Sequence, residues 1–364
     1  MAAGFAQWGN DLYAGRRSYD IVGRRRIWFT ISTILVILSA ILLIKPGLNP
    51  GIEFRGGSQF VVSGVPNADE QLAIDTVKSI APEESPEVTK LGTDSLRIQT
   101  SELANEQVEE VASALQAAYG VSEDEVASSY IGPSWGADIS KKAITGILVF
   151  LVFVTVVMTI YFRNWRMALA ALIALFHDLI ITVGVYAAVG WEVTPATVIG
   201  FLTILGYSIY DTVVVFDKVR ENTADTLDQS RYTYAEKANL AVNQTLVRSI
   251  NTSVVALLPV GAILFVGAFI LGAGTLRDIA LALFVGMLIG TFSSIFLATP
   301  FEVTLREREP AIRDHTRKVL AARKARAEAG GEADEPILAS AVHGATQLRP
   351  GAHQGVQAQP KRRR

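Results

Sequence analysis

The sequence predicts an α-helical polytopic membrane protein with six transmembrane helices and one small α+β domain outside the membrane. Six apolar runs each approach the roughly 20 residues that a membrane-spanning helix needs. Hydrophobic residues make up 50% of the chain and charged residues 19%, as expected of a chain that alternates between lipid and water. One polar stretch, 45–142, separates the first apolar run from the other five. This stretch is long enough to fold as a separate domain.

The six predicted spans justify the helical part of this class. The first run shows no evident small-x-small cleavage site and is long enough to span, so we interpret it as a retained anchor rather than a cleaved signal. Gly and Thr interrupt several of the runs, as membrane helices tolerate. The runs cover residues 27–44, 143–162, 167–189, 194–216, 250–271 and 279–299.

Lys and Arg residues predict the orientation of these spans. They precede span one, fill the turn between spans two and three, lie between spans four and five, and follow span six, whereas loop 190–194 has none and loop 272–278 has only Arg277. The positive-inside rule therefore predicts both termini in the cytoplasm of a multi-pass protein of the cytoplasmic membrane. The predicted regions are a cytoplasmic N-terminus 1–26, span 27–44, an extracytoplasmic domain 45–142, spans two to six within 143–304, and a cytoplasmic tail 305–364.

The extracytoplasmic stretch predicts a ferredoxin-like domain. Gly56 and Gly57 indicate a bend or a close backbone approach in its first strand, and Asn67 with Glu70 resembles a helix start. A second amphipathic helix ends at Gly120. The predicted order is a strand at 54–62, a helix to residue 80, strands at 86–91 and 94–100, the second helix, and a strand at 126–131. This βαββαβ order is the ferredoxin-like motif.

The C-terminal region turns polar after residue 302. Residues 304–329 predict a charged, Arg-rich helix, and residues 330–364 have the composition of a disordered tail that ends in Lys361, Arg362, Arg363 and Arg364. Such a tail could bind an anionic membrane leaflet or a ribosome by charge. A solvated tail without a binding role is an equally good interpretation.

Asp211 is the residue that says most about function, because it lies inside span four, about two helical turns before its cytoplasmic end. A charged Asp within a membrane helix costs roughly 2.5–3.5 kcal/mol on insertion scales. Intramembrane charges therefore predict an ion or proton site. The structural alternative is a carboxylate that pairs with an Arg and fixes helix packing.

Arg248 is the expected counter-charge, because it opens span five on the same side of the membrane. An Asp that alternates between an Arg-paired and a protonated state is the simplest proton-coupled switch. The alternative is that Arg248 extends to the lipid phosphates as an anchor. Polar residues around it predict a hydrated vestibule: Asn243, Gln244, Thr245, Asn251 and Thr252.

His177 and Asp178 fall near the middle of span three. An intramembrane His could relay protons, or it could be a neutral side chain that makes one interhelical hydrogen bond. Glu192, Arg277 and Asp278 lie at the opposite helix ends, where we expect membrane-interface residues.

The sequence also excludes several classes of chemistry. The chain has no cysteine, which rules out disulfides, thiolate metal sites and cysteine nucleophiles. It contains no phosphate-binding GxxxxGK[ST] loop, no HExxH and no GxSxG. We therefore expect no enzymatic activity, no cofactor, no metal and no nucleic-acid partner. The available energy source is an ion gradient, worth about 2.3 kcal/mol per charge per 100 mV.

Four segments, in this order, resemble the SecD/SecF family of the bacterial protein-export apparatus, which is grouped with the resistance-nodulation-division proton-driven membrane proteins. They are Gly-Ile-Glu-Phe-Arg-Gly-Gly at 51–57, Phe-His-Asp at 176–178, GYSIYDTVVVFDKVREN at 206–222 and NQTLVRSINT at 243–252. The resemblance covers residues 27–304. It implies that these six spans are one half of a resistance-nodulation-division-like membrane unit.

The resemblance implies a partner, SecD, that supplies another six spans, and a pair that works with the SecYEG channel. It also implies that the proton-motive force helps to pull preproteins outward after SecA has pushed them. The intramembrane Asp and Arg of the family correspond to Asp211 and Arg248. Tyr210 departs from the family, which often has Asn before this Asp. The alternatives are a small-molecule or lipid exporter of the same superfamily and a passive scaffold that stabilises SecD.

Overall fold

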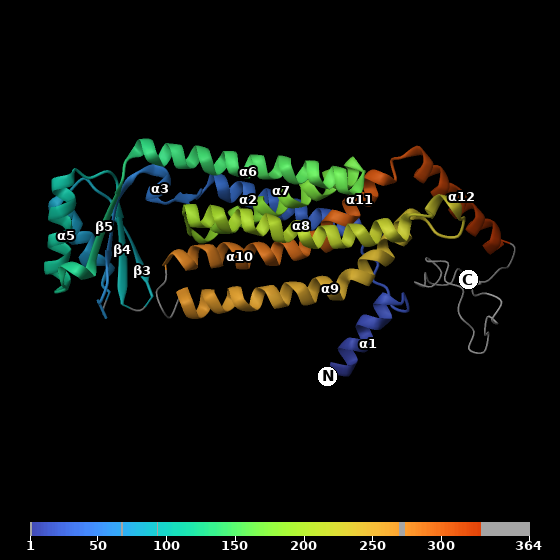
Figure 1. Cartoon of the computed structure of the whole chain (residues 1–364), viewed down its shortest axis with the longest axis horizontal. Coiled ribbons are helices and arrows are strands. Elements are labelled where there is room, and N and C mark those ends of the chain that lie inside the picture. The colour runs from blue at the N-terminus through green and yellow to red at the C-terminus, as the bar shows by residue number, and fades with distance from the viewer. Residues whose placement is uncertain (1, 67, 93, 269–273, 329–364) are drawn as a thin grey trace, which may run out of the picture.

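The computed structural model describes residues 2–66, 68–92, 94–268 and 274–328 as an elongated helical bundle with a sheet domain at one end (Figure 1). The last described helix, α12 (Pro310–Glu328), lies at the opposite end of the bundle (Figure 1). Within the described residues, six helical segments are long and apolar enough to cross a membrane. They are built on α2 (Arg25–Ile44), α6 (Pro133–Phe162), α7 (Trp165–Val189), α8 (Pro195–Thr223), α9 (Tyr234–Ala262) and α10 (Gly274–Ser293).

Local sequence signals set the ends of the central helices. The Asn164 side chain caps α7 by accepting a hydrogen bond from the amide of Arg166, and the helix ends at Gly190 in the left-handed conformation that glycine favours. Thr194 caps α8 in a capping box with Thr197, and Pro195 occupies its first turn. These short connections place α7 and α8 side by side and antiparallel.

The helices differ in regularity. Helix α8 runs without a break through 195–223, whereas α9 contains Pro259 and continues as a π-helix, Ile263–Ala268. After α10 comes a second π-helix, Ser294–Ala298, and then α11 (Thr299–Arg306). Wide turns of this kind often occur at functional sites. Helix α9 also begins well before the predicted start of span five, because the polar stretch before Ile250 remains helical.

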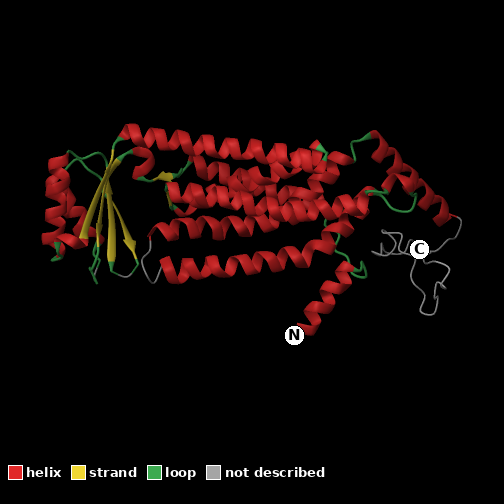
Figure 2. Ribbon diagram, in the orientation of Figure 1, coloured by secondary structure: helices red, strands yellow, loops and turns green. Residues whose placement is uncertain are grey.

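The sheet domain, residues 57–131, has the ferredoxin-like order that the sequence predicts. Its elements are β2 (Gly57–Val62), α4 (Glu70–Ile80), β3 (Glu87–Leu91), β4 (Ser95–Thr100), α5 (Asn105–Tyr119), a 3₁₀ turn (Glu123–Glu125) and β5 (Val126–Ile131). The strands pair antiparallel in the order β3-β4-β2-β5. The core lies between α4, α5 and one face of the sheet, around Phe60, Ile98 and Leu115. The strands stand between α5 and the membrane helices, so the other face of the sheet looks toward the bundle (Figures 1 and 2).

Two details of this domain differ from the prediction. Phe54 belongs to the short helix α3 (Ile52–Arg55) rather than to a strand, and the strand starts only at Gly57. Gly57 has a φ of +140°, and a Cβ there would collide with the backbone carbonyl of Thr100, so the chain turns into the sheet where only glycine fits. Asp69 caps α4, and the expected cap, Asn67, lies outside the described residues.

A second, two-stranded sheet joins the two parts of the molecule. Strand β1 (Asn49–Pro50) precedes the sheet domain and pairs in parallel with β6 (Glu192–Val193) from the turn between α7 and α8. The amide of Gly51 also donates to the carbonyl of Val193 at 2.9 Å. The entry to the sheet domain is thereby fixed to the start of α8.

The side-chain amides of two asparagines of α9 bind the N-terminal segment that follows α1 (Ala2–Tyr13). The amide of Tyr19 donates to Asn243 Oδ1 at 2.7 Å, and the amides of Ile21 and Val22 donate to Asn239 Oδ1 at 2.9 and 3.0 Å. The predicted hydrated vestibule is therefore wrong for Asn243, because its buried amide binds the protein backbone. The same correction applies to Gln244, which donates to the carbonyl of Tyr13, and to the buried Thr245, which donates to backbone carbonyls of its own helix.

Replacing Asn239 by Ala should release this N-terminal segment. The substitution removes the acceptor of two backbone amides, each hydrogen bond being worth roughly 1 kcal/mol. We expect faster proteolytic cleavage between residues 13 and 25, measured by limited digestion in detergent. Asn251→Ala, at an exposed position of the same helix, is the matched control, and equal cleavage of the two variants would contradict this assignment.

The C-terminal helical region breaks in two. The predicted helix over 304–329 is interrupted after α11, and Pro310 begins α12 (Pro310–Glu328). Arg323 of α12 pairs with Glu236 at 2.6 Å, so α12 folds back onto α9. The predicted disordered tail, 330–364, lies outside the described residues.

Candidate functional site

Among the buried carboxylates of the described helices, Asp178 and Asp211 lie inside the bundle where α7, α8, α9 and α10 pack together. Asp178 comes from α7 and Asp211 from α8, and their side chains are 0% and 3% exposed. Each receives hydrogen bonds from hydroxyl groups of neighbouring helices. We refer to Asp178, Asp211 and the serines that bind them (Ser208, Ser249 and Ser293) as the polar layer. Polar side chains in a membrane bundle mark a functional site or an interhelical contact, and the polar layer has features of both.

Asp211 has one bonded and one open carboxylate oxygen. Its Oδ1 accepts a hydrogen bond from the Ser249 hydroxyl of α9 at 2.7 Å. Its Oδ2 is buried and has no hydrogen-bond partner within the described part of the chain. A proton can be added to a carboxylate oxygen that accepts no hydrogen bond without breaking an existing contact.

Further hydroxyls extend from the Asp211 contact. The Ser253 hydroxyl lies one turn along α9 and donates to the carbonyl of Ser249 at 2.8 Å. Thr291 of α10 donates to Ser253 at 2.6 Å, and Tyr207 of α8 reaches the same hydroxyl at 3.5 Å. This chain connects three helices around Asp211.

Asp178, by contrast, is fully bonded. Its Oδ2 accepts hydrogen bonds from Ser208 of α8 at 2.6 Å and from Ser293 of α10 at 2.8 Å. Its Oδ1 lies 3.1 Å from His177 Nδ1. Next to it, Ser294 opens the π-helix that follows α10. Asp178 thus ties three helices together at the place where the last span changes its helical geometry.

The structure does not form the expected ion pair between Arg248 and Asp211. The Arg248 side chain is exposed, and no ion pair among the described residues joins it to Asp211. The reason is helical geometry: Ser249, one residue further along α9, faces Asp211, and a rotation of about 100° per residue turns Arg248 away from it. Tyr210, the residue before Asp211, is 52% exposed on the bundle surface.

His177 connects this layer to a hollow on the apolar surface of the bundle. A cavity of about 490 Å³ between α2 and α7 is lined by His177 together with Ser32, Phe29 and Phe176. Both His177 Nε2 and Ser32 Oγ are buried without a partner among the described residues. His177 therefore has one nitrogen on Asp178 and the other toward this cavity.

Two family models match the chain, and they decide its family. SecD/SecF C-terminal, a protein export membrane protein model, matches residues 110–308, and the SecD/SecF GG motif matches residues 41–66. The chain belongs to the SecD/SecF family. The first of these models alone matches more than half of the chain, and this match confirms the resemblance seen in the sequence.

Individual SecD/SecF relatives agree with this assignment. The chain is 48% identical to the protein translocase subunit SecF of Streptomyces coelicolor, an alignment that covers 90% of the chain and 87% of the relative. It is 40% identical to the SecF of Mycobacterium tuberculosis, over 94% of the chain and 82% of the relative.

A solved structure supports the family fold. The chain is similar to the crystal structure of Thermus thermophilus SecDF, described as a translocon-associated membrane protein. The TM-score is 0.71 at 30% identity, and the match covers 81% of the chain. It covers 39% of the SecDF chain, so this SecD/SecF-family chain corresponds to part of that longer protein.

The sequence alone does not predict which hydroxyl groups bind the two carboxylates. Ser208, Ser249 and Ser293 resemble the other serines of the apolar runs, and what distinguishes them is the facing helix. A partial signal existed in α9, where Ser249 and Ser253 share one helix face at a spacing of four residues.

Ser249→Ala tests the contact to Asp211. The substitution removes the one hydrogen bond that the described residues donate to this carboxylate, a contact worth roughly 1.5–3 kcal/mol when the acceptor is charged. We expect slower export of a reporter preprotein, but not its loss, because Asp211 itself remains. Thr252→Ala on the same helix is the control, and wild-type export by Ser249→Ala would show that this hydroxyl does not matter to the site.

Proposed function

We propose that this SecD/SecF-family chain is a SecF-type subunit of the Sec protein translocase. In this proposal it works with SecD in the cytoplasmic membrane and assists late export of preproteins through SecYEG, after SecA has pushed them. The names of its relatives support the translocase role, and the single-chain SecDF of Thermus thermophilus supports SecD as the partner.

The observation that carries the mechanism is the open oxygen of Asp211. A buried carboxylate with one free oxygen can bind and release a proton while Ser249 keeps its contact with the other oxygen. Protonation removes a charge from the bundle interior, which changes the balance of forces on α8. We infer that protons driven by the membrane potential alternate Asp211 between two states, and that α8 moves with them.

Arg248, His177 and Asp178 have different places in this proposal. Arg248 is one helical position from the Asp211 contact, so a rotation of α9 by about 100° would exchange Ser249 for Arg248 opposite Asp211. His177 and Asp178 form a second polar site that reaches the surface cavity. The proposed cycle moves helices and protons, and it includes no covalent chemistry.

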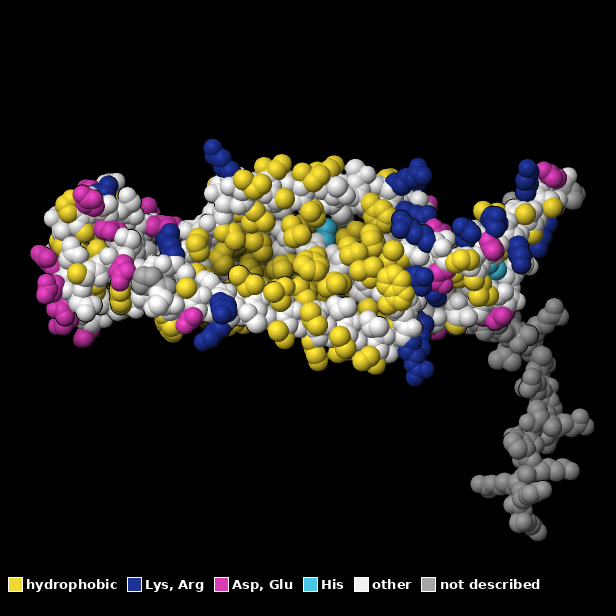
Figure 3. All heavy atoms as spheres, turned by 90° about the horizontal axis from the view of Figure 1, so that it is seen from above, with side chains coloured by type: hydrophobic (Ala, Val, Ile, Leu, Met, Phe, Trp, Pro, Cys, Tyr) yellow, Lys and Arg dark blue, Asp and Glu magenta, His cyan; other side chains and the backbone are white. Residues whose placement is uncertain are grey.

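The surface charges support the proposed orientation. Figure 3 shows a hydrophobic belt with Lys and Arg side chains gathered at the end that carries the C-terminal helix. Acidic side chains gather on the sheet domain at the other end (Figure 3). By the positive-inside rule, this distribution supports the proposal that both termini are cytoplasmic and that the sheet domain lies outside, where preproteins emerge.

The proposed energy source is tested by collapsing the gradient. Export of a reporter preprotein is measured in membrane vesicles that contain SecYEG, SecA, ATP and SecD, with and without this chain. We expect the increment due to the chain to disappear when a protonophore is added, while SecA-driven export continues. An increment that survives the protonophore would refute proton coupling.

A further inference from the structure

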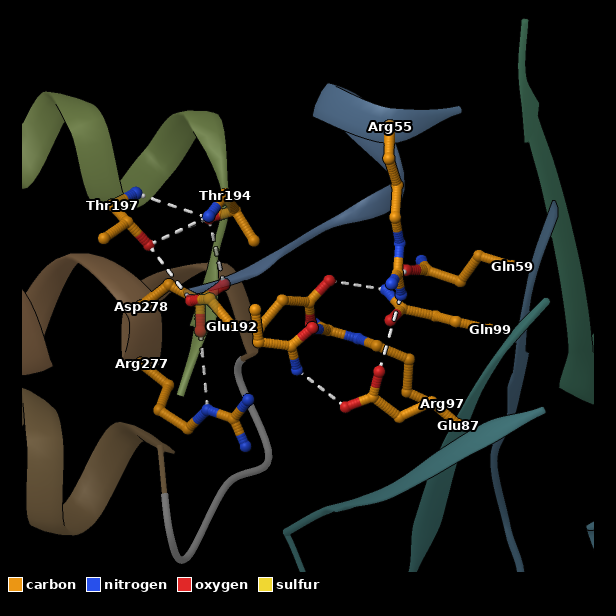
Figure 4. A network of polar contacts seen from close by, with 11 residues as sticks. Arg55, Gln59, Glu87, Arg97, Gln99, Glu192, Thr194, Thr197, Arg277 and Asp278 are labelled. Carbon is orange, nitrogen blue, oxygen red and sulfur yellow. Dashed lines mark hydrogen bonds and ion pairs between the residues drawn. The ribbon is translucent and has the colours of Figure 1, made fainter. Parts of the chain in front are cut away.

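A buried polar network connects the sheet domain to the start of α8 (Figure 4). Glu192, in the turn before α8, accepts a hydrogen bond and ion pair from Arg97 Nη1 at 2.9 Å. Its other oxygen accepts a hydrogen bond from Gln99 Nε2 at 2.6 Å. Arg97 and Gln99 both lie on β4, on the face of the sheet that looks toward the bundle.

This ion pair is more deeply buried than an ordinary surface ion pair. The side chains of Arg97 and Glu192 are 11% and 10% exposed, so water screens their attraction weakly. Gln99 also donates to Gln59 of the neighbouring strand at 3.0 Å. Burial, followed by the nearby charge of Glu192, raises the pKa of the neighbouring Glu53 carboxyl.

The same network continues into the helices that carry the polar layer. Thr194, the cap of α8, donates to Asp278 Oδ2 at 3.2 Å, and Asp278 lies in the first turns of α10 next to Arg277. From Thr194 to Asp211 the helix is unbroken, a distance of roughly 25 Å at 1.5 Å per residue. A movement of α8 at Asp211 therefore reaches Glu192 along a regular helix.

We propose that Glu192 is the positioning residue that makes the sheet domain move with α8. Its backbone pairs with β1, its carboxylate is held by Arg97 and Gln99, and it stands two residues before the α8 cap. This inference rests on the proposed proton-driven function, and it assigns the point at which helix movement becomes domain movement. We refer to the contacts of Glu192 with Arg97 and Gln99 as the Glu192 joint.

The joint can be tested by a distance measurement in a chain that contains no natural cysteine. Spin labels are placed at two exposed positions, Glu110→Cys on α5 and Ile199→Cys on α8, in the full chain assembled with SecD. The distance distribution should be narrow and should stay the same when Asp211→Asn is added. Glu192→Gln should broaden the distribution and reduce export by roughly tenfold, a typical coupling effect.

The matched control is Glu70→Gln, which neutralises a carboxylate paired with Lys90 at 3.8 Å within the sheet domain. It should leave both the distance distribution and export unchanged. If Glu192→Gln keeps a narrow distribution and normal export, the joint is refuted. If it loses export with a narrow distribution, Glu192 acts in another way and the joint is equally refuted. Normal export by Asp211→Asn would instead refute the proton mechanism, and the distances would still report on the joint.

Two further variants decide the matter if Glu192→Gln does not assemble with SecD. Gln99→Leu removes one contact and leaves the buried ion pair, and it should broaden the distribution to a smaller extent. The pair Pro50→Cys and Val193→Cys bridges partner residues of β1 and β6. Oxidation of this pair should leave export unchanged, since the two strands move together. Export that stops on oxidation and returns on reduction would show that this contact opens, and would overturn the proposal.

Discussion

Replacing Asp211 by Asn should abolish gradient-dependent export while the chain still assembles with SecD. Asn keeps an oxygen that can accept the hydrogen bond from Ser249, so the packing of α8 against α9 survives. It cannot gain or lose a proton at this position. Losing the drive of one charge at 100 mV removes about 2.3 kcal/mol, equivalent to about 50-fold in rate.

The experiment uses cells whose only copy of this protein carries Asp211→Asn, with export of a reporter preprotein as the readout and SecD co-purification as the assembly control. Asp217→Asn is the matched substitution. Asp217 lies at the end of the same helix, where Tyr161 donates to it at 2.8 Å, and its loss should change export little. Normal export by Asp211→Asn would mean that this chain is a scaffold and that energy coupling belongs to SecD.

Replacing Asp178 by Ala should destabilise the bundle more than any other single change in the polar layer. The substitution leaves the Ser208 hydroxyl without its acceptor, leaves Ser293 only its contact with the Gly290 carbonyl at 3.1 Å, and removes the contact to His177. An unpaired buried hydroxyl costs about 1–3 kcal/mol, toward the lower end inside membranes. We expect a lower unfolding midpoint in detergent and a smaller amount of the complex with SecD.

Asp178→Asn separates packing from proton transfer. The amide keeps one oxygen for the serine hydroxyls but cannot carry a proton, so a packing role predicts nearly normal stability and export. Loss of export at normal stability would instead make His177 and Asp178 a proton relay. A variant Asp178→Ala as stable as the wild-type protein would contradict the structural role of the network.

The sequence predicted the architecture because membrane spans and the ferredoxin-like order of strands and helices both produce local sequence patterns. Apolar runs located the six helices, and Gly120, in the left-handed conformation, ended α5 where expected. The pattern failed where helix geometry overrides composition. The polar stretch before Ile250 continued as helix, and Phe54 became helical because Gly57 must turn the chain into the sheet.

The sequence predicted the carboxylates of the candidate site but not the serine hydroxyls that bind them. Asp211 and Asp178 stand out because an acid in an apolar run is rare, whereas the serines that bind them are ordinary in membrane helices. The expected pairing of Asp211 with Arg248 followed from charge alone. The rotation of α9 decides the contact instead, and it cannot be deduced from spacing within a single helix. The Glu192 joint depends on residues 97, 99 and 192, which only the tertiary fold brings together.

Proton flux measured directly would test the central claim that Asp211 carries the proton. The full chain and SecD are reconstituted into liposomes that contain a pH-sensitive dye, and a membrane potential is imposed in the presence of SecYEG, SecA and a preprotein. The account predicts proton entry with the wild-type chain, none with Asp211→Asn, and proton entry with strongly reduced export with Glu192→Gln. Equal proton entry with the wild-type chain and Asp211→Asn would contradict it.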